Sequence, residues 1–375
     1  MTEVVVLGGG VTGCAAALAL LGRGHKVIVL EPDVVEAGAP RATAGHLALG
    51  TGSPYVEVVR RHGPEASREI WEAYREANER VAETVGDLAD DCGYRKAGGF
   101  LLARSRAEAK ALCTSEDLLR EEAFGGEFLD HYLLEARFNV TGFTGAYWAE
   151  DEADLDACAL HGALAAAVEA RGGSIHEASP VRELVLHRGG AEAVTPGGRV
   201  RSPAAFVAED GGAARMVPFL EGRIILEDLQ CALFDVKAEA MIPSPGRVSG
   251  GDLFWRRTAD GLNAGRFDAT GESSPGEGAD PGGEAEAALD GFVASSFAGV
   301  SRRPKRRWTE TIGTTPDGLP LVGPLPDLPA VAVCGHGRFG LALGLLAARW
   351  AAEALATGHD PTPARFRLGR PFGGP

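Results

Sequence analysis

The stretch that decides the fold opens the chain: Val4-Val5-Val6-Leu7, followed by Gly8-Gly9-Gly10-Val11-Thr12-Gly13 and an alanine- and leucine-rich run to about Arg23. The four apolar residues predict a buried parallel strand, and the run after the glycines predicts a helix. Strand, glycine turn and helix in this order are the setting that a dinucleotide-binding G-x-G-x-x-G motif requires.

Each glycine of this motif has a physical task. Gly8 makes the tight turn, Gly10 lets a pyrophosphate approach the backbone, and Gly13 lets the helix pack closely on the strand. The phosphates would lie at the helix N-terminus, beside Val11 and Thr12, where unpaired N–H groups and the helix dipole favour anions. We therefore expect these five residues to contact a dinucleotide.

A second predicted strand, Lys26 to Leu30, ends at Glu31. An acid at this distance beyond the last glycine accepts hydrogen bonds from the ribose hydroxyls and excludes a 2′-phosphate. NAD and FAD both satisfy the motif, so the motif alone leaves the choice between them open.

Four later stretches resemble the D-amino-acid oxidase family, which includes glycine, sarcosine and γ-glutamylputrescine oxidases. Residues Gly38 to Leu47 look like its second flavin-contact loop, and Leu155 to Val181 look like its helix and strand beside adenine. Residues Trp308 to Gly323 resemble its late strand and turn, and Gly335 to Gly340 resemble the loop and helix start beneath the flavin ring. The resemblance implies FAD rather than NAD.

The resemblance also implies which residues hold FAD beyond the first motif. They are Arg41, Thr43, Gly45 and His46 in the second loop, Val181 against adenine, and Gly337, Arg338, Phe339 and Gly340 near the ring. Members with a cysteine-linked flavin carry cysteine where this chain has Glu310, so the FAD is expected to be non-covalent. The apolar run from Leu341 to Leu355 predicts a helix whose N-terminus points its N–H groups at the ring, where they favour negative charge.

The expected fold class is α/β, with a discontinuous Rossmann-like FAD-binding domain and a second, mainly antiparallel β-sheet substrate domain. Residues 1–80, 145–215 and 310–375 would form the first, and 81–144 and 216–309 the second. Residues 64–91 carry an apolar stripe at Ile70, Tyr74, Ala77, Val81 and Val85, which predicts an amphipathic helix.

Candidate catalytic and substrate residues follow from the same resemblance. Arg338 falls where glycine-oxidase-like members place an arginine beside the substrate carboxylate, which a guanidinium grips bidentately. His46 and His336 fall in loops near the ring and would orient water or tune the flavin. Phe254 and Trp255 are candidates for the pocket wall, although aromatic residues in strands are more often core residues.

The chain also departs from the family pattern. Ile312 stands where many members carry the main carboxylate-binding arginine, so Arg338, Arg256 or Arg257 would have to hold an acidic group. Asn263 falls near the lysine that promotes the oxygen reaction in sarcosine-oxidase-like members. Glu209 and Asp210 replace an apolar Ala-Gly run.

The function that this pattern predicts is FAD-dependent oxidation of a small amine or amino acid. Its sharpest version is a glycine-oxidase-like reaction on an N-substituted glycine, with dioxygen as electron acceptor and hydrogen peroxide as product. Two alternatives remain: a flavin dehydrogenase acting on a 2-hydroxy acid, and a flavin-binding subunit without turnover.

Composition narrows the partners. The formal net charge of −15 argues against nucleic acid or an anionic membrane as partner. The six cysteines lack a C-x-x-C pair, so we expect neither a metal site nor a redox motif. A strand that begins at Glu3 and the lack of a long apolar run predict a cytoplasmic protein with no membrane span.

Overall fold

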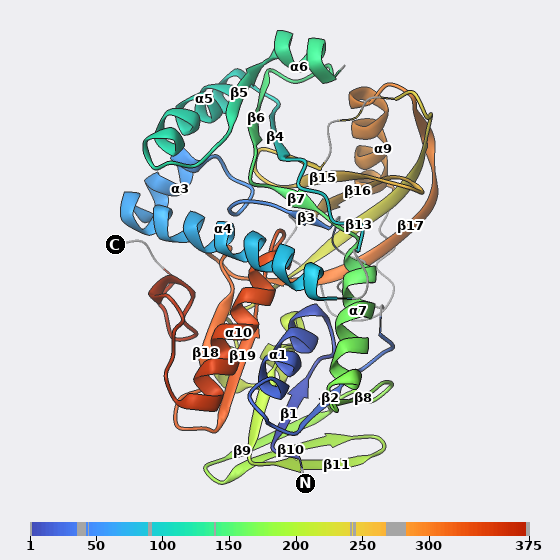
Figure 1. Cartoon of the computed structure of the whole chain (residues 1–375). Coiled ribbons are helices and arrows are strands. Elements are labelled where there is room, and N and C mark those ends of the chain that lie inside the picture. The colour runs from blue at the N-terminus through green and yellow to red at the C-terminus, as the bar shows by residue number, and fades with distance from the viewer. Residues whose placement is uncertain are drawn as a thin grey trace.

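The computed structural model describes residues 2–35, 43, 45–88, 92–138, 140–240, 242, 245–267 and 283–372. Within them the chain forms two large sheets, one near the N-terminus in the lower half of Figure 1 and one in the upper half. No helix in these ranges is long and apolar enough to cross a membrane.

The first large sheet has six strands and is parallel except at one edge. In spatial order they are β18 (Leu321–Pro324), β19 (Ala330–Cys334), β12 (Ala204–Val207), β1 (Val4–Leu7), β2 (Val27–Leu30) and β8 (Ser174–His176). Only β18 runs antiparallel to its neighbour. Because these strands come from three distant parts of the sequence, the predicted discontinuous Rossmann-like domain is confirmed.

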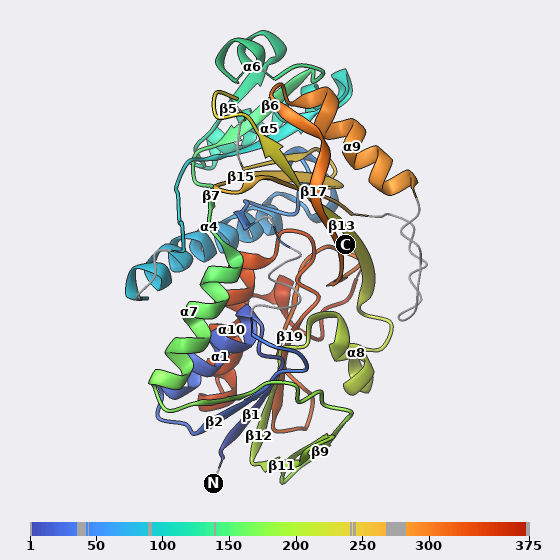
Figure 2. The same cartoon turned by 90° about the vertical axis from the view of Figure 1, so that its right-hand side faces the viewer.

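Both faces of this sheet are covered, which explains why β1 is an unbroken apolar run. Val4 and Val6 pack towards the helices α1 (Val11–Leu21), α7 (Ala157–Ala170) and α10 (Leu341–Thr357), which lie together on one side in Figure 2. Val5 and Leu7 pack towards a small antiparallel sheet on the other side. That sheet consists of β9 (Glu183–His187), β10 (Gly190–Thr195) and β11 (Gly198–Ser202).

The second large sheet has eight strands, all antiparallel to their neighbours except for the pair β14 and β4. In spatial order they are β17 (Val300–Thr314), β13 (Ile225–Val236), β16 (Gly261–Phe267), β15 (Leu253–Thr258), β14 (Gly246–Val248), β4 (Gly99–Ala103), β6 (Gly145–Ala149) and β5 (Glu127–Asp130). This is the predicted antiparallel domain. Strand β6 lies in this sheet although it begins at the expected boundary of 145, and β17 runs across the expected boundary of 310.

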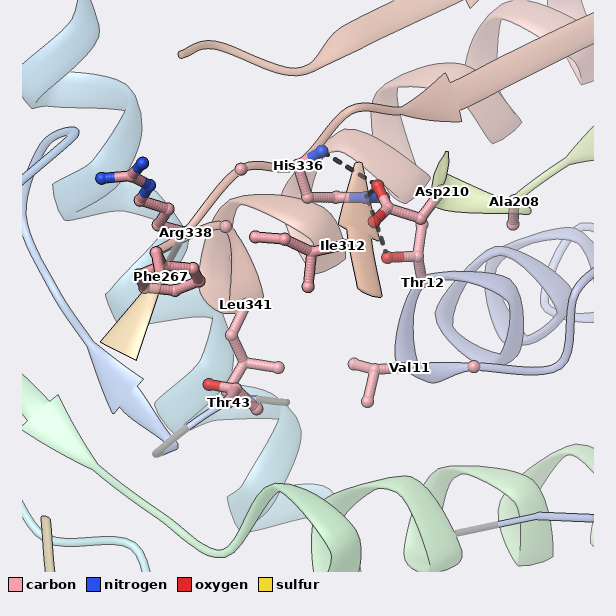
Figure 3. Close-up of a pocket in the computed structure, with 13 residues that line it drawn as sticks. Val11, Thr12, Thr43, Ala208, Asp210, Phe267, Ile312, His336, Arg338 and Leu341 are labelled. Atoms are coloured by element: carbon pink, nitrogen blue, oxygen red, sulfur yellow. Dashed lines mark hydrogen bonds and ion pairs between the residues drawn. The ribbon is translucent and has the colours of Figure 1, made fainter. Parts of the chain in front are cut away.

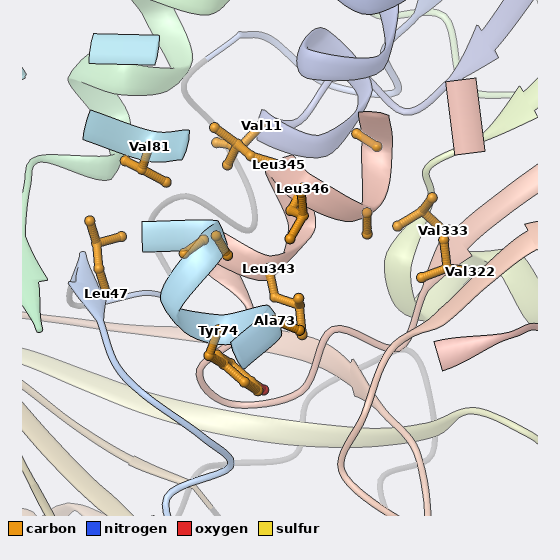
Figure 4. Packing of buried hydrophobic residues seen from close by; sticks show 14 of the residues in the cluster. Val11, Leu47, Ala73, Tyr74, Val81, Val322, Val333, Leu343, Leu345 and Leu346 are labelled. Atoms are coloured by element: carbon orange, nitrogen blue, oxygen red, sulfur yellow. The ribbon is translucent and has the colours of Figure 1, made fainter. Parts of the chain in front are cut away.

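Helix α4 (Pro64–Asp87) lies between the two sheets. All five residues of its predicted apolar stripe are buried, so the amphipathic helix is confirmed. Figure 4 shows Tyr74 and Val81 of α4 in one core cluster with Leu343 and Leu346 of α10.

The remaining elements are short or lie at the periphery. They are β3 (His46–Leu47) paired with β7 (Ala153–Asp154), the helices α3 (Tyr55–His62), α5 (Arg106–Glu121), α6 (His131–Phe138), α8 (Ala213–Met216) and α9 (Glu284–Ser296), and the 3-10 turns η1 (Asp210–Gly212), η2 (Pro218–Leu220) and η3 (Ala364–Phe366).

Candidate active site

The turn between β1 and α1 has the geometry of a phosphate-binding loop. Gly8 has a φ of +90°, and a Cβ there would lie 2.6 Å from the Ala208 carbonyl oxygen. A Cβ on Gly13 would collide with the carbonyl oxygen of Gly8, whereas a Cβ on Gly10 would meet no atom within 4 Å. Gly8 and Gly13 therefore hold the turn together, and Gly10 turns an open face to the space where a pyrophosphate would lie.

The carboxylate of Glu31 is fixed at the end of β2 by backbone donors. The Gly9 N–H donates to its Oε2 at 2.7 Å, and the Asp33 N–H donates to its Oε1 at 3.0 Å. Each oxygen keeps a lone pair for another donor, which fits the ribose hydroxyls of a dinucleotide.

The segment expected to face adenine lies beside this acid. Ser179 donates its N–H to the Glu31 carbonyl oxygen at 2.8 Å, and Val181 packs against the core on that side of the sheet. In the second loop, Gly45 donates its N–H to Thr43 Oγ1 at 3.0 Å. Arg41 lies outside the described residues.

A pocket opens from the phosphate loop towards the second sheet (Figure 3). It encloses about 710 Å³ of space free of protein atoms, part of it open to solvent. Its lining is Gly10, Val11, Thr12, Thr43, Ala208, Asp210, Phe267, Ile312, His336, Gly337, Arg338, Gly340 and Leu341. The pocket thus joins the first motif, the second loop and the loop before α10, which lie far apart in the sequence.

One wall of the pocket holds a chain of three polar side chains. Asp210 Oδ1 accepts hydrogen bonds from the backbone N–H of His336 at 3.0 Å and from its Nδ1 at 2.7 Å. Asp210 Oδ2 accepts from the Gly313 N–H at 2.8 Å, and the far side of the imidazole places Nε2 3.1 Å from Thr12 Oγ1. The second acid after β12, a departure from the family pattern, therefore fixes the orientation of His336.

These donors decide the charge of Asp210. Burial by itself would raise the pKa of Asp210, but the hydrogen bonds and positive potential from His336 and the N–H of Gly313 outweigh burial and lower that pKa below its ordinary value. Asp210 is accordingly a fixed anion at neutral pH.

The loop before α10 brings the remaining predicted ring contacts together. Gly337, Arg338 and Gly340 line the pocket. Phe339 is buried, with its ring edge-on to Phe267 at 6.3 Å between centroids. Helix α10 has no acidic residue in its first turn, so its N-terminal N–H groups are not neutralised from within the helix.

Arg338 is already paired. Its Nε and Nη2 donate to the two carboxylate oxygens of Glu227 at 2.9 and 3.1 Å, and its guanidinium lies 5.0 Å from the centre of the Phe267 ring. Sequence reasoning missed Glu227, because nothing near Ile225 to Val236 signals that an acid will pair with an arginine of the pocket wall.

His46 lies in a different environment from the one expected. Its Nε2 lies 2.7 Å from Glu152 Oε2, and Arg247 donates to both oxygens of Glu152 at 2.7 Å. All three side chains are almost fully buried. Burial lowers the pKa of His46, against the opposing effect of Glu152, and His46 is absent from the pocket lining. The structure therefore places it in a buried ion network, in edge-on contact with Phe339.

The two aromatic candidates of β15 point in opposite directions, as neighbours on a strand must. Phe254 belongs to the cluster of Phe267, Ile312 and Phe339 on the pocket side. Trp255 packs against Phe297 in the core beneath α9, with 5.1 Å between ring centroids. The expectation that Trp255 walls the pocket is corrected by this alternation.

The structure also shows where the other residues that depart from the family pattern lie. Ile312 lines the pocket, so an apolar side chain occupies this part of the wall. Asn263 lines a neighbouring hollow with Thr43 and Arg256, and no lysine lines either cavity among the described residues. Arg256 is largely buried, with its Nε 3.4 Å from Asp154.

The fold and the site define a two-domain dinucleotide-binding protein whose pocket lies between a Rossmann-like sheet and an antiparallel sheet. A family model described as FAD dependent oxidoreductase matches residues 3–354. The chain belongs to this FAD-dependent oxidoreductase family, and its cofactor is FAD.

Individual relatives are distant. The chain is 27% identical over 186 residues to the γ-glutamylputrescine oxidoreductase of Escherichia coli, covering 48% of this chain and 43% of that protein. It is 27% identical over 256 residues to the glycine oxidase of Geobacillus kaustophilus, covering 64% of this chain and 61% of that protein. Each alignment thus spans less than two thirds of the relative.

Solved structures resemble the whole chain. The crystal structure of the Geobacillus kaustophilus glycine oxidase superposes with a TM-score of 0.80 at 21% identity, covering 99% of both chains. An iminodiacetate oxidase from Chelativorans sp. superposes with a TM-score of 0.75 at 16% identity, covering 97% of this chain and 98% of that one. At these identities the likeness concerns the fold.

Proposed function

We propose that this protein oxidises the C–N bond of a small amine or amino acid with non-covalently bound FAD. When bound, the flavin would accept the hydride lost from the carbon next to nitrogen, and water would hydrolyse the resulting imine to a carbonyl compound and an amine or ammonia. Dioxygen would take up the two electrons and leave as hydrogen peroxide. The sharpest form expected from the sequence is a glycine-oxidase-like reaction on an N-substituted glycine.

The observation that carries this proposal is the pocket itself. One end is the phosphate loop with Gly10, and the other is an apolar wall of Phe267, Ile312 and Leu341 beside the start of α10. Apolar walls exclude water and keep an amine neutral, which hydride loss from the neighbouring carbon requires. The chain's own residues thus bind, orient and desolvate, which is the protein's task in a flavin enzyme.

Two groups of residues have distinct tasks within this proposal. Glu31 and the N-terminus of α1 bind the nucleotide half, and the N-terminus of α10 stabilises negative charge at the ring. His336, held by Asp210, places a polar side chain next to the apolar residues of the pocket wall. FAD is held without a covalent bond, since Glu310 stands where a linking cysteine would be.

The experiment is a visible spectrum followed by anaerobic titration of the purified protein. The panel contains amino acids, N-alkyl and N-carboxymethyl glycines, polyamines and 2-hydroxy acids, with the oxidised flavin absorbance as readout. We expect an amine or amino acid to bleach the flavin and air to restore it with peroxide formation. Bleaching by 2-hydroxy acids alone would identify the dehydrogenase alternative, and a yellow protein that nothing bleaches would identify the subunit without turnover.

A further inference from the structure

We call the end of the pocket at Phe267, Ile312 and Leu341, where the flavin ring would lie, the ring end. None of the described residues that line the pocket offers an unpaired positive charge there. Its charged or titratable lining residues are Asp210, His336 and Arg338. Asp210 and His336 are hydrogen-bonded to each other. Arg338 is therefore the only one of the three whose fixed positive charge would attract a substrate carboxylate. The residue paired with Arg338 determines how strongly it attracts an anion.

The partner is an acid in good geometry. Arg338 and Glu227 form a two-pronged ion pair at 2.9 and 3.1 Å, the arrangement in which a guanidinium grips a substrate carboxylate. The third nitrogen, Nη1, lies 3.4 Å from the Gly250 carbonyl oxygen. Only 21% of the Arg338 side chain and 18% of the Glu227 side chain are exposed, so solvent screens the pair incompletely.

The strand register explains why an acid reaches this place. Glu227 in β13 lies directly opposite Ile312 in β17. Residues directly opposite in an antiparallel pair share one face of the sheet. Ile312 occupies the position where the family pattern leads one to expect an arginine, so an apolar side chain stands there and the residue opposite it is an acid.

We infer that the substrate carries no carboxylate on the carbon that is oxidised, and that Glu227 sets this preference by occupying and neutralising Arg338. This inference rests on the proposed function and narrows it from amines and amino acids to amines, so it excludes the N-substituted glycine that the sequence led us to expect. A substrate carboxylate placed here would meet a guanidinium already paired and a second carboxylate nearby, an arrangement that disfavours the anion in a poorly screened site. An alkyl group meets Ile312 and Phe267 instead, which favours its burial.

The first test measures anion binding and needs no turnover. The FAD-loaded full chain is titrated with propionate, and the change in flavin absorbance gives the Kd. We expect Glu227→Gln to bind propionate at least tenfold more tightly than the wild type, because the amide leaves the Arg338 charge unbalanced. The double variant Glu227→Gln/Arg338→Gln should lose this gain. Equal propionate affinity in wild type and Glu227→Gln would overturn the inference.

A matched control lies one residue along the strand. Asp228 accepts a hydrogen bond from Thr311 Oγ1 at 2.8 Å, and its side chain points to the other face of β13. Asp228→Asn removes the same charge without touching Arg338, so its propionate affinity should stay within twofold of the wild type. A gain equal to that of Glu227→Gln would mean that net charge alone is responsible, which contradicts the inference.

The double variant Glu227→Gln/Arg338→Gln keeps the inference testable if Glu227→Gln alone does not fold. It removes two charges that already balance each other, so its propionate Kd should stay within threefold of the wild-type value. A larger loss of affinity would show that Arg338 binds carboxylates in the wild type and would overturn the inference.

The second test compares diethylamine with N-ethylglycine, which differ by one methyl group in place of one carboxylate. Under anaerobic conditions, diethylamine should reduce the wild-type flavin at least tenfold more efficiently, and Glu227→Gln should narrow the ratio. Preference for N-ethylglycine would overturn the inference and leave the proposed function standing. If no amine or amino acid reduces the flavin, the proposed function fails, and the propionate comparison still decides the role of Glu227.

Discussion

The two ends of the cofactor pocket are built by different means. At the nucleotide end, backbone atoms and glycines do most of the shaping, as at Gly8, Gly10 and Gly13. At the ring end, side chains hold one another in place, as Asp210 holds His336 and Glu227 holds Arg338. The shape of the first end therefore depends on one short segment, whereas that of the second depends on contacts between residues far apart in the sequence.

Two adjacent acids after β12 show the difference directly. Burial and the nearby Glu31 raise the pKa of Glu209 to about 7, because few donors compensate for the lost water. Burial acts on Asp210 as well, but the donors from His336 and Gly313 outweigh it and lower its pKa. Neighbouring acids thus acquire opposite pKa shifts because Glu209 lies near another carboxylate, whereas Asp210 accepts hydrogen bonds from His336 and Gly313.

The largest loss of stability is expected for a substitution at Gly13, where the helix lies against the backbone of the glycine turn. Gly13→Ala places a Cβ against the Gly8 carbonyl oxygen, which cannot move without deforming the turn. We expect a loss of about 3 kcal/mol in the free energy of unfolding, measured by urea denaturation, together with loss of bound flavin. Gly86→Ala in α4, where a Cβ meets nothing within 4 Å, is the matched control and should cost no stability. Equal effects of the two would refute the close-packing role of Gly13.

At the ring end, Asp210→Asn should lower the free energy of unfolding at pH 7 by about 2 kcal/mol, because an amide replaces an anion that accepts three hydrogen bonds. The pKa of Asp210 is depressed in the folded protein, so its contribution is present above the ordinary value of 3.8 and is lost as the pH falls through the lower folded value. The difference between wild type and variant should shrink below about pH 4. A difference that stays constant down to pH 2 would contradict the anionic role.

Glu209→Gln should raise the free energy of unfolding at neutral and higher pH, whereas Asp210→Asn lowers it. The folded pKa of about 7 lies above the ordinary 4.5, so the folded state binds the extra proton between these values and stability falls as the pH rises through that window. We expect the variant to match the wild type at pH 4 and to exceed its free energy of unfolding by about 2 kcal/mol at pH 8. The exposed Glu221, changed to Gln, is the control. A variant that is less stable than the wild type at pH 8 would disprove the raised pKa.

The smallest effect is expected for Thr12→Val, which keeps the shape of the side chain and removes the contact to His336 Nε2. One neutral hydrogen bond of this kind contributes about 1 kcal/mol. Thermal denaturation should show a correspondingly small decrease in Tm, and in the Asp210→Asn background the decrease should be smaller still, because His336 is no longer held in place. Full additivity of the two changes would argue against a connected chain of side chains.

Local sequence patterns predicted the dinucleotide-binding motif and the amphipathic helix α4. The glycine motif, the acid after β2 and the apolar stripe of α4 were all readable, because each depends on the backbone conformation or periodicity of one short segment. The two-domain arrangement followed from resemblance. The side to which Trp255 points was not readable, since a strand with apolar residues on both faces gives no alternation from which to assign a face.

The sequence by itself determined that this chain binds a dinucleotide through a βαβ unit, because the turn, the phosphate approach and the ribose acid all lie within about thirty residues. Only the tertiary structure decided the chemistry of the ring end. Asp210 meets His336, Glu227 meets Arg338, and Glu152 meets Arg247 and His46 across separations of 126, 111, 95 and 106 residues. Such pairs arise from strand register and sheet packing, which no local pattern encodes, and they determine which charges remain free to meet a substrate.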